Sequence, residues 1–215
     1  AGKMKTRKSS VLFPANEFMA NLKRTREDIL TSAIDLVHRR GLQSTGLKDL
    51  FAATHASSGS FYNYFQSKDE FAHALIDYQW QQIRENAFLA ATSITEDPIQ
   101  RLFWVIDKIE AKHLSEINCA GCLLGNLIVD LTAYNETFRQ HLQQVFDEWH
   151  SFFAQMLRQG QEQLRDRVDP DLLAEQILTM LEGVLLISRL YDQPDRLKRG
   201  FSNIRQLITD SLKVF

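Results

Sequence analysis

The sequence has few of the residues that interrupt helices. Its 215 residues include only nine glycines and four prolines, and no segment repeats the alternation of β-branched and polar residues that is typical of strands. Hydrophobic residues make up 44% and charged residues 24% of the chain, a composition typical of globular proteins with one large or two small cores. We therefore predict an all-α fold of about nine helices.

Long apolar runs are also absent. No uninterrupted apolar stretch approaches the roughly 20 residues that a membrane span needs. The N-terminal region has cations but lacks the apolar segment of a secretion signal. We therefore expect a cytoplasmic protein without a membrane partner.

The sequence also lacks the common catalytic motifs. None of its six histidines belongs to an H-E-x-x-H pair, and neither G-x-S-x-G nor a phosphate-binding glycine loop occurs. An enzyme is therefore the less favoured class, and we expect no cofactor.

Charge is distributed unevenly along the chain. Residues 1–68 contain 11 Lys and Arg against 5 Asp and Glu, whereas residues 69–215 contain 14 against 22. A small basic region followed by a larger acidic one predicts that the first meets a polyanion and the second does not.

The first part of the chain divides into an arm, a first helix of about four turns and two short helices. Residues 1–22 show no clear period and are expected to form a flexible arm. Thr25 is a suitable cap for a first helix, which Gly41 ends. A second, short helix and a third that begins at Ser57 follow after tight turns. This spacing predicts a helix-turn-helix within residues 23–70.

The third helix belongs to a segment that combines small polar residues, aromatics and a cation. Phe61 and Phe65 are four residues apart, so both can dock inward from one helix face. An aromatic-rich connector that only fills the core is the alternative interpretation. If the segment is a recognition helix, the groups left for a groove are those of Ser60, Tyr62 and Asn63.

Four parts of this region carry a known pattern, namely Arg26-x-x-Ile29-Leu30, Gly41, Leu47-x-x-Leu50 and Ser57-x-Gly59-Ser60-Phe61-Tyr62-x-Tyr64-Phe65-x-Ser67-Lys68-x-x-Phe71. Together they resemble the DNA-binding domain of the tetracycline-repressor (TetR) family. The resemblance implies a recognition helix in the major groove and phosphate contacts from the second, third and fourth helices. The DNA-binding residues expected on this basis are Thr45, Lys48, Ser57, Ser58, Gly59, Ser60, Tyr62, Asn63, Tyr64 and Lys68.

Two positions depart from the family pattern. His55 replaces the small turn residue, and Ser58 replaces a frequent Lys or Arg near the DNA. These departures leave the preferred DNA sequence and the affinity open. A helical ligand- or redox-sensing module without specific DNA binding is therefore the alternative to a regulator.

The chain has only two cysteines, Cys119 and Cys122, which form a C-x-x-C motif. A structural metal needs four ligands, and His113 is the nearest histidine, so we expect no metal site. A thioredoxin-type catalyst would need a βαβ context, which is absent. The motif is compatible with a redox or electrophile sensor. The favoured alternative is that Cys122 is a small buried residue at a helix start.

The residues around Cys122 carry a second resemblance. Gly121-Cys122-Leu123 with Asn126 and Asp130 is similar to a segment of TetR-like regulators that include electrophile- and quinone-responsive repressors. Their reactive cysteine corresponds to Cys122. The same segment also occurs in members that sense non-covalent ligands.

Residues 71–215 are expected to form a larger helical domain for effector binding and dimerisation. This region has more large aromatics than a simple helical stripe requires, so as a set they can line an apolar pocket. Core packing is the alternative for each ring. The candidate effector residues are Phe88, Phe103, Trp104, Cys122, Tyr134, Phe138, Phe146 and Trp149.

The last two predicted helices are apolar over more than one face. They begin at Asp169-Pro170 and at Pro194, and two copies of the pair can form a four-helix bundle between subunits. The family resemblance implies the same interface, and packing within one chain is the alternative. The expected interface residues are Leu173, Ile177, Leu181, Val184, Leu185, Phe201, Ile204 and Ile208.

Together these features predict a homodimeric DNA-binding regulator with two recognition helices about one duplex turn apart. Its partners would be a palindromic operator and a small hydrophobic, electrophilic or oxidising effector. By family resemblance it would act as a repressor that the effector releases from the operator.

Overall fold

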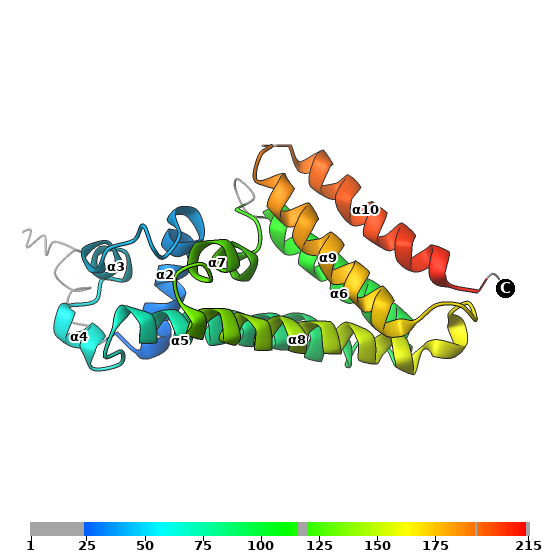
Figure 1. Cartoon of the computed structure of the whole chain (residues 1–215), viewed down its shortest axis with the longest axis horizontal. Helices are drawn as coiled ribbons and strands as arrows, with labels where there is room; N and C mark the ends of the chain where they lie inside the picture. The colour runs from blue at the N-terminus through cyan, green and yellow to red at the C-terminus, as the bar shows by residue number, and fades with distance from the viewer. Residues whose placement is uncertain (1–23, 116–119, 192, 214–215) are drawn as a thin grey trace, which may run out of the picture.

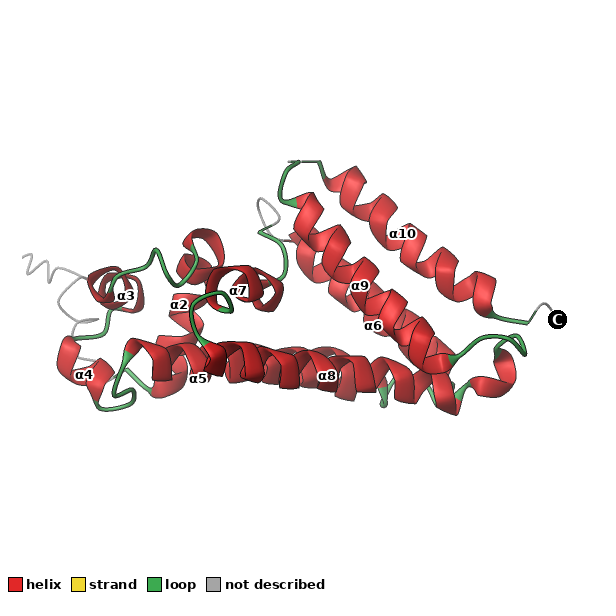
Figure 2. Ribbon diagram, in the orientation of Figure 1, coloured by secondary structure: helices red, strands yellow, loops and turns green. Residues whose placement is uncertain are grey.

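A computed structural model describes residues 24–115, 120–191 and 193–213. Within these ranges the structure contains nine α-helices and no strand, which confirms the all-α prediction (Figure 2). The elements are α2 (Arg26–Arg40), α3 (Leu47–Thr54), α4 (Ser58–Tyr62), α5 (Lys68–Ile83), the π-helical η1 (Arg84–Leu89), α6 (Pro98–Ser115), α7 (Leu123–Leu131), α8 (Glu136–Gln159), the 3-10 helix η2 (Gln161–Gln163), α9 (Pro170–Ser188) and α10 (Pro194–Ser211).

The molecule is elongated, with α2, α3 and α4 at one end and α9 and α10 toward the other (Figure 1). The α5 and α8 helices lie side by side along the long axis and connect the two ends. Because α5 begins in the small N-terminal unit and continues into the larger one, the two units share a continuous helix.

The first helix forms as its sequence predicts. Thr25 and Asp28 make a reciprocal capping box, in which Thr25 Oγ1 accepts the Asp28 N–H at 3.1 Å and Asp28 Oδ2 accepts the Thr25 N–H at 2.9 Å. Gly41 ends the helix with a φ of +77°, a conformation that favours glycine.

The turn between α3 and α4 is tight because His55 adopts a left-handed conformation, with a φ of 52°. Ser57 then caps α4, and its Oγ accepts the Ser60 N–H at 3.1 Å. Phe61 and Phe65 are buried as predicted, with ring centroids 5.1 Å apart. This arrangement is the predicted helix-turn-helix.

The α5 helix continues without a break beyond Ile83, where it widens into the π-helical turn η1. Ser67 begins it by accepting the Glu70 N–H at 3.0 Å. A π-helical turn depends on packing around the helix, so local sequence signals did not indicate it.

The larger unit is a helical bundle in which α9 packs against α8 and α10, and α10 also packs against α6. A backbone hydrogen bond of 2.9 Å from the Arg165 N–H to the Ser211 carbonyl joins the α8–α9 connection to the end of α10. Gly200 allows a close approach of α10 to α9, because a Cβ there would lie 2.5 Å from Val184 Cγ1. Among the described helices, none has the length and apolar character needed to cross a membrane.

The bundle corrects the residues predicted for the dimer interface. Seven of the eight are no more than 3% exposed within one chain, so they belong to its own core. The eighth, Val184, is half-buried against Gly200. The sequence pattern therefore identified the core-facing sides of both helices. The seven buried residues are Leu173, Ile177, Leu181, Leu185, Phe201, Ile204 and Ile208.

Candidate nucleic-acid interface and internal cavity

The end of the molecule formed by α3 and α4 exposes most of the residues predicted to contact DNA. Lys48 and Lys68 are at this end, and neither forms an ion pair with a carboxylate in the described part of the chain. Tyr62 is 46% exposed although its ring packs edge-on against Phe61. The exposed members of the predicted set are Lys48, Ser57, Ser58, Gly59, Tyr62 and Asn63, and the half-buried members are Ser60, Tyr64 and Lys68.

Thr45 is a correction to the predicted set. Its side chain is completely buried, and its hydroxyl donates a 2.6 Å hydrogen bond to the Gly41 carbonyl. The hydroxyl is therefore committed to the α2–α3 loop and does not face a phosphate. Its role is to hold the loop in place before α3.

A ring cluster fixes α4 in position. The Phe71 ring of α5 packs against Phe61 and Phe65, at centroid distances of 5.5 and 5.3 Å. The guanidinium group of Arg26 lies 5.5 Å from the centroid of the Phe65 ring. Because both phenylalanines point inward, the short polar side chains of α4 remain on the surface.

A cavity of about 650 Å³ lies between the N-terminal unit and the bundle. Thr31, Ile34 and His38 of α2 form one wall, while α5, η1 and α6 supply most of the rest. Cys122 and Trp149 also line it. The N-terminal unit and the larger unit therefore share one internal surface.

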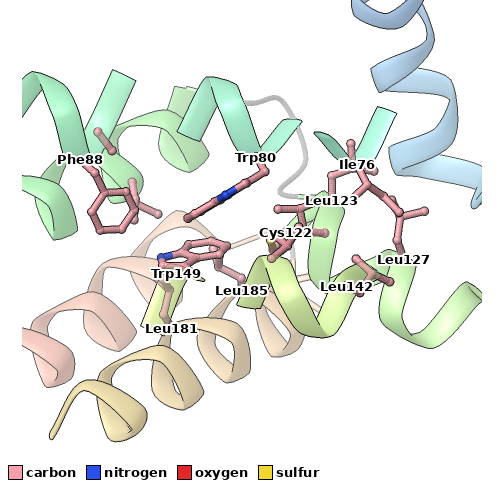
Figure 3. Close-up of a cluster of buried hydrophobic side chains, with 14 of the residues drawn as sticks. Ile76, Trp80, Phe88, Cys122, Leu123, Leu127, Leu142, Trp149, Leu181 and Leu185 are labelled. Carbon is pink, nitrogen blue, oxygen red and sulfur yellow. The ribbon is translucent and has the colours of Figure 1, made fainter. Parts of the chain in front are cut away.

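Only two of the eight predicted effector residues, Cys122 and Trp149, line this cavity. Figure 3 shows Cys122 beside the rings of Trp80 and Trp149, whose centroids are 5.5 Å apart. The prediction missed the α2 wall because no local signal brings α2 next to α6.

The other six predicted aromatics have different environments. Phe88 and Phe138 are buried, and Phe138 stacks on the His73 ring at 4.4 Å. Tyr134 is 78% exposed, which removes it from any enclosed site. The remaining three, all half-buried, are Phe103, Trp104 and Phe146.

Cys122 stands at the beginning of α7, where its sulfur accepts the Gly125 N–H at 3.4 Å. Burial and the nearby Glu182 carboxylate raise the pKa of the thiol well above its ordinary value. Burial also raises the pKa of Glu182 to about 7, although the hydrogen bond from the thiol opposes this shift. Cys122 is therefore a protonated donor at neutral pH. The other predicted redox residue, Cys119, lies outside the described residues.

The α7 helix connects the cavity to the N-terminal unit at both of its ends. Before it begins, the Gly121 carbonyl lies 2.7 Å from His38 Nε2. Near its end, Asp130 Oδ2 accepts the N–H groups of Leu42 and Gln43 at 2.6 and 3.1 Å. These contacts tie the α2–α3 loop to a helix whose first residue, like Cys122 before it, lines the cavity.

A second polar contact joins α5 to α8 on another face. His73 Nδ1 lies 2.8 Å from His141 Nδ1, and His141 Nε2 lies 2.7 Å from Asp77 Oδ1. Burial lowers the pKa of His73, and the nearby His141 adds to this shift. The described residues contain no group of three or more histidines, cysteines or acidic residues placed to hold a metal ion.

Comparisons with known proteins agree with this architecture. Residues 29–75 match the model of bacterial regulatory proteins of the tetR family, and residues 98–204 match a tetracyclin repressor-like C-terminal domain. An HTH-type transcriptional regulator of Lactococcus lactis is 31% identical over 188 residues, which are 86% of this chain and 93% of that protein. The transcriptional repressor DhaR of Mycobacterium sp. strain GP1 is 26% identical and aligns over 75% of this chain and 80% of its own.

A solved structure with a similar level of sequence identity has the same fold. The regulatory protein TetR from Rhodobacter sphaeroides is 28% identical and superimposes with a TM-score of 0.74, covering 84% of this chain and 97% of that one. The relatives are transcriptional regulators and not enzymes, in agreement with the prediction from the sequence. The chain belongs to the tetR family of bacterial regulatory proteins.

Proposed function

We propose that the protein is a homodimeric repressor that leaves a palindromic operator when a small molecule fills the internal cavity. The main support for this proposal is that the N-terminal unit forms part of the cavity wall. Thr31, Ile34 and His38 belong to the N-terminal unit and also line the cavity. A ligand in this space therefore contacts the DNA-binding unit directly.

Base contacts are assigned to the exposed face of α4. Tyr62 and Asn63 are exposed there and offer a hydroxyl and an amide to base edges. Lys48, Tyr64 and Lys68 would contact phosphates on either side. The missing cation at Ser58 is the only support for a sensing module without specific DNA binding. Lys48 and Lys68, which form no ion pair with any described residue, favour a regulator.

The dimer is assigned to the outward side of α9. Leu172 and Leu186 are 59% and 50% exposed and lie on one face of this helix, and Leu190, which is 75% exposed, follows directly after its end. Gly183 lies on the same side, and a Cβ added there would meet nothing within 4 Å. Such a face is suited to close packing against the α9 of a second copy.

Coupling between the cavity and the DNA-binding unit is assigned to α7. A ligand that moves Cys122 shifts the start of α7, and Asp130 transmits the shift to the α2–α3 loop. Binding of ligand and of operator is then reciprocally linked, because each changes the affinity for the other by the same factor.

A non-covalent effector has more support than an electrophile or oxidant. Covalent sensing requires a thiolate, and the Cys122 thiol is buried and protonated beside Glu182. Repression rests on the family resemblance and on the similarity to DhaR, which is named a repressor. Because the partner is operator DNA, the proposed location is the cytoplasm.

Titration of labelled DNA from the flank of its own gene tests the proposal. The protein should bind with strong salt dependence, and Lys48→Ala or Lys68→Ala should reduce the salt slope by about 1. Lys198→Ala, a change at an exposed position of α10, is the matched control and should bind normally. Salt-independent binding, or equal losses in all three variants, would contradict the assignment.

A further inference from the structure

The mouth of the cavity is electropositive. Lys108 and Lys112 lie one turn apart on α6, both are exposed, and both line the cavity. Lys108 also lies 5.8 Å from the centroid of the Trp104 ring. Neither lysine forms an ion pair within the described ranges, and no aspartate or glutamate of those ranges lines the cavity.

Two further residues of the cavity lining, Trp149 and Gln79, have buried polar side chains. Trp149 is 2% exposed, and its indole N–H finds no acceptor among the described residues. Gln79 is 5% exposed, and its amide makes no side-chain hydrogen bond within the same residues. Buried polar groups of this kind cost free energy unless a partner reaches them. Both residues line the cavity.

The rest of the lining is largely apolar. Its aliphatic surface comes from Ile83, Ala87, Ile109 and Leu123. The volume of about 650 Å³ is within the range of small-molecule sites. The cavity therefore has room for a hydrocarbon body together with a polar end.

Glu182, the buried acidic residue beside Cys122, should repel a bound anion only weakly. Glu182 lies behind the Cys122 thiol and is not part of the lining. Its carboxyl is also partly protonated at neutral pH, because burial raises its pKa to about 7.

We propose that the cavity binds an amphipathic organic monoanion, a small carboxylate with an aliphatic or aromatic body. The carboxylate lies toward Lys108 and Lys112, and the body packs against Ile109, Leu123 and Trp149. This assignment rests on the proposed function, since it gives the chemical class of the effector.

Calorimetric titration of the purified full chain with octanoate, octanamide and octylamine tests the assignment. These probes share one hydrocarbon body and differ in the charge of the head group. Octanoate should bind at least about tenfold more tightly than octanamide, because ionised hydrogen bonds are the stronger ones. Octylamine should bind most weakly.

Lysine variants identify the position of the head group. Lys108→Gln and Lys112→Gln should each weaken octanoate binding by about three- to tenfold and leave octanamide binding unchanged. Lys198→Gln makes the same change of charge on α10, outside the cavity, and should have no effect. Equal binding of octanoate and octanamide, equal losses in all three variants, or no binding of any probe would overturn the proposal.

Operator binding separates this inference from the proposed function. If octanoate binds through the lysines but does not release the DNA, the ligand class stands and the proposed switch fails. If DNA is released by neutral ligands, and octanoate binds no better than octanamide, the switch stands and the ligand class fails.

Discussion

Replacement of Glu182 by glutamine should make the protein more stable at pH 8 than the wild type. The Glu182 carboxyl group is buried beside Cys122, and its Oε1 has no hydrogen-bond partner among the described residues. Burial raises its pKa from 4.5 to about 7. A folded-state pKa above the unfolded value means that the native protein binds the proton more tightly.

The sign and size of the effect follow from this difference. Below about pH 4.5 the Glu182 carboxyl is protonated in both states, and the free energy of unfolding falls as pH rises toward 7. Each unit of pKa corresponds to about 1.4 kcal/mol, so the ionised group costs up to about 3 kcal/mol at pH 8. Glutamine has a similar shape and no charge. Glu182→Gln should therefore be nearly neutral at pH 5 and stabilising at pH 8.

Urea unfolding followed by circular dichroism at pH 5, 6, 7 and 8 measures the effect, at one protomer concentration because a dimer would link stability to concentration. Glu175→Gln, at an exposed position of the same helix, controls for the loss of a surface charge. Parallel pH profiles of wild type and Glu182→Gln would refute the reasoning. So would a variant that is less stable at pH 8 than at pH 5, relative to the wild type.

Three other predictions test packing, coupling and titration. Gly200→Ala should destabilise the chain by about 1–3 kcal/mol in urea unfolding, because the new Cβ would lie 2.5 Å from Val184 Cγ1; an unchanged free energy of unfolding would contradict this. Asp130→Ala should leave two loop N–H groups without their acceptor and weaken DNA binding in an anisotropy titration, so unchanged affinity would exclude α7 as the link. The lowered pKa of His73 means that stability should decline as pH falls through its ordinary value of 6.5. His73→Gln should flatten that decline, and an unchanged slope would show that another group is responsible.

The helix starts could be predicted because each depends on a few adjacent residues. Thr25, Ser57, Ser67 and Asp169 all accept a backbone N–H two or three positions later, as their sequence contexts indicated. The inward position of Phe61 likewise follows from helical spacing. Such features need no knowledge of the rest of the chain.

Other features depend on which distant segments meet. Thr45 looks like an exposed hydroxyl in sequence, but it is completely buried, and its hydroxyl donates a hydrogen bond to the Gly41 carbonyl. Leu181 and Leu186 lie on different sides of α9, and both are apolar. Helical spacing alone therefore cannot tell which of them packs against the core. Cavity membership is harder still, since Thr31 and Lys112 are 81 positions apart and only the tertiary fold brings them to one space.

The α7 helix is short enough to transmit a displacement without bending. Its nine residues span about 13 Å, with Cys122 at the cavity and Asp130 on the α2–α3 loop. Arg189, directly after the end of α9, also donates a 2.7 Å hydrogen bond to Asn126 in the first turn of α7. A movement of α7 therefore acts on the DNA-binding unit at one end and on α9 at the other. If α9 is the dimer contact, the same movement changes both the angle of each DNA-binding unit and the distance between the two, and a palindrome with fixed spacing is sensitive to both.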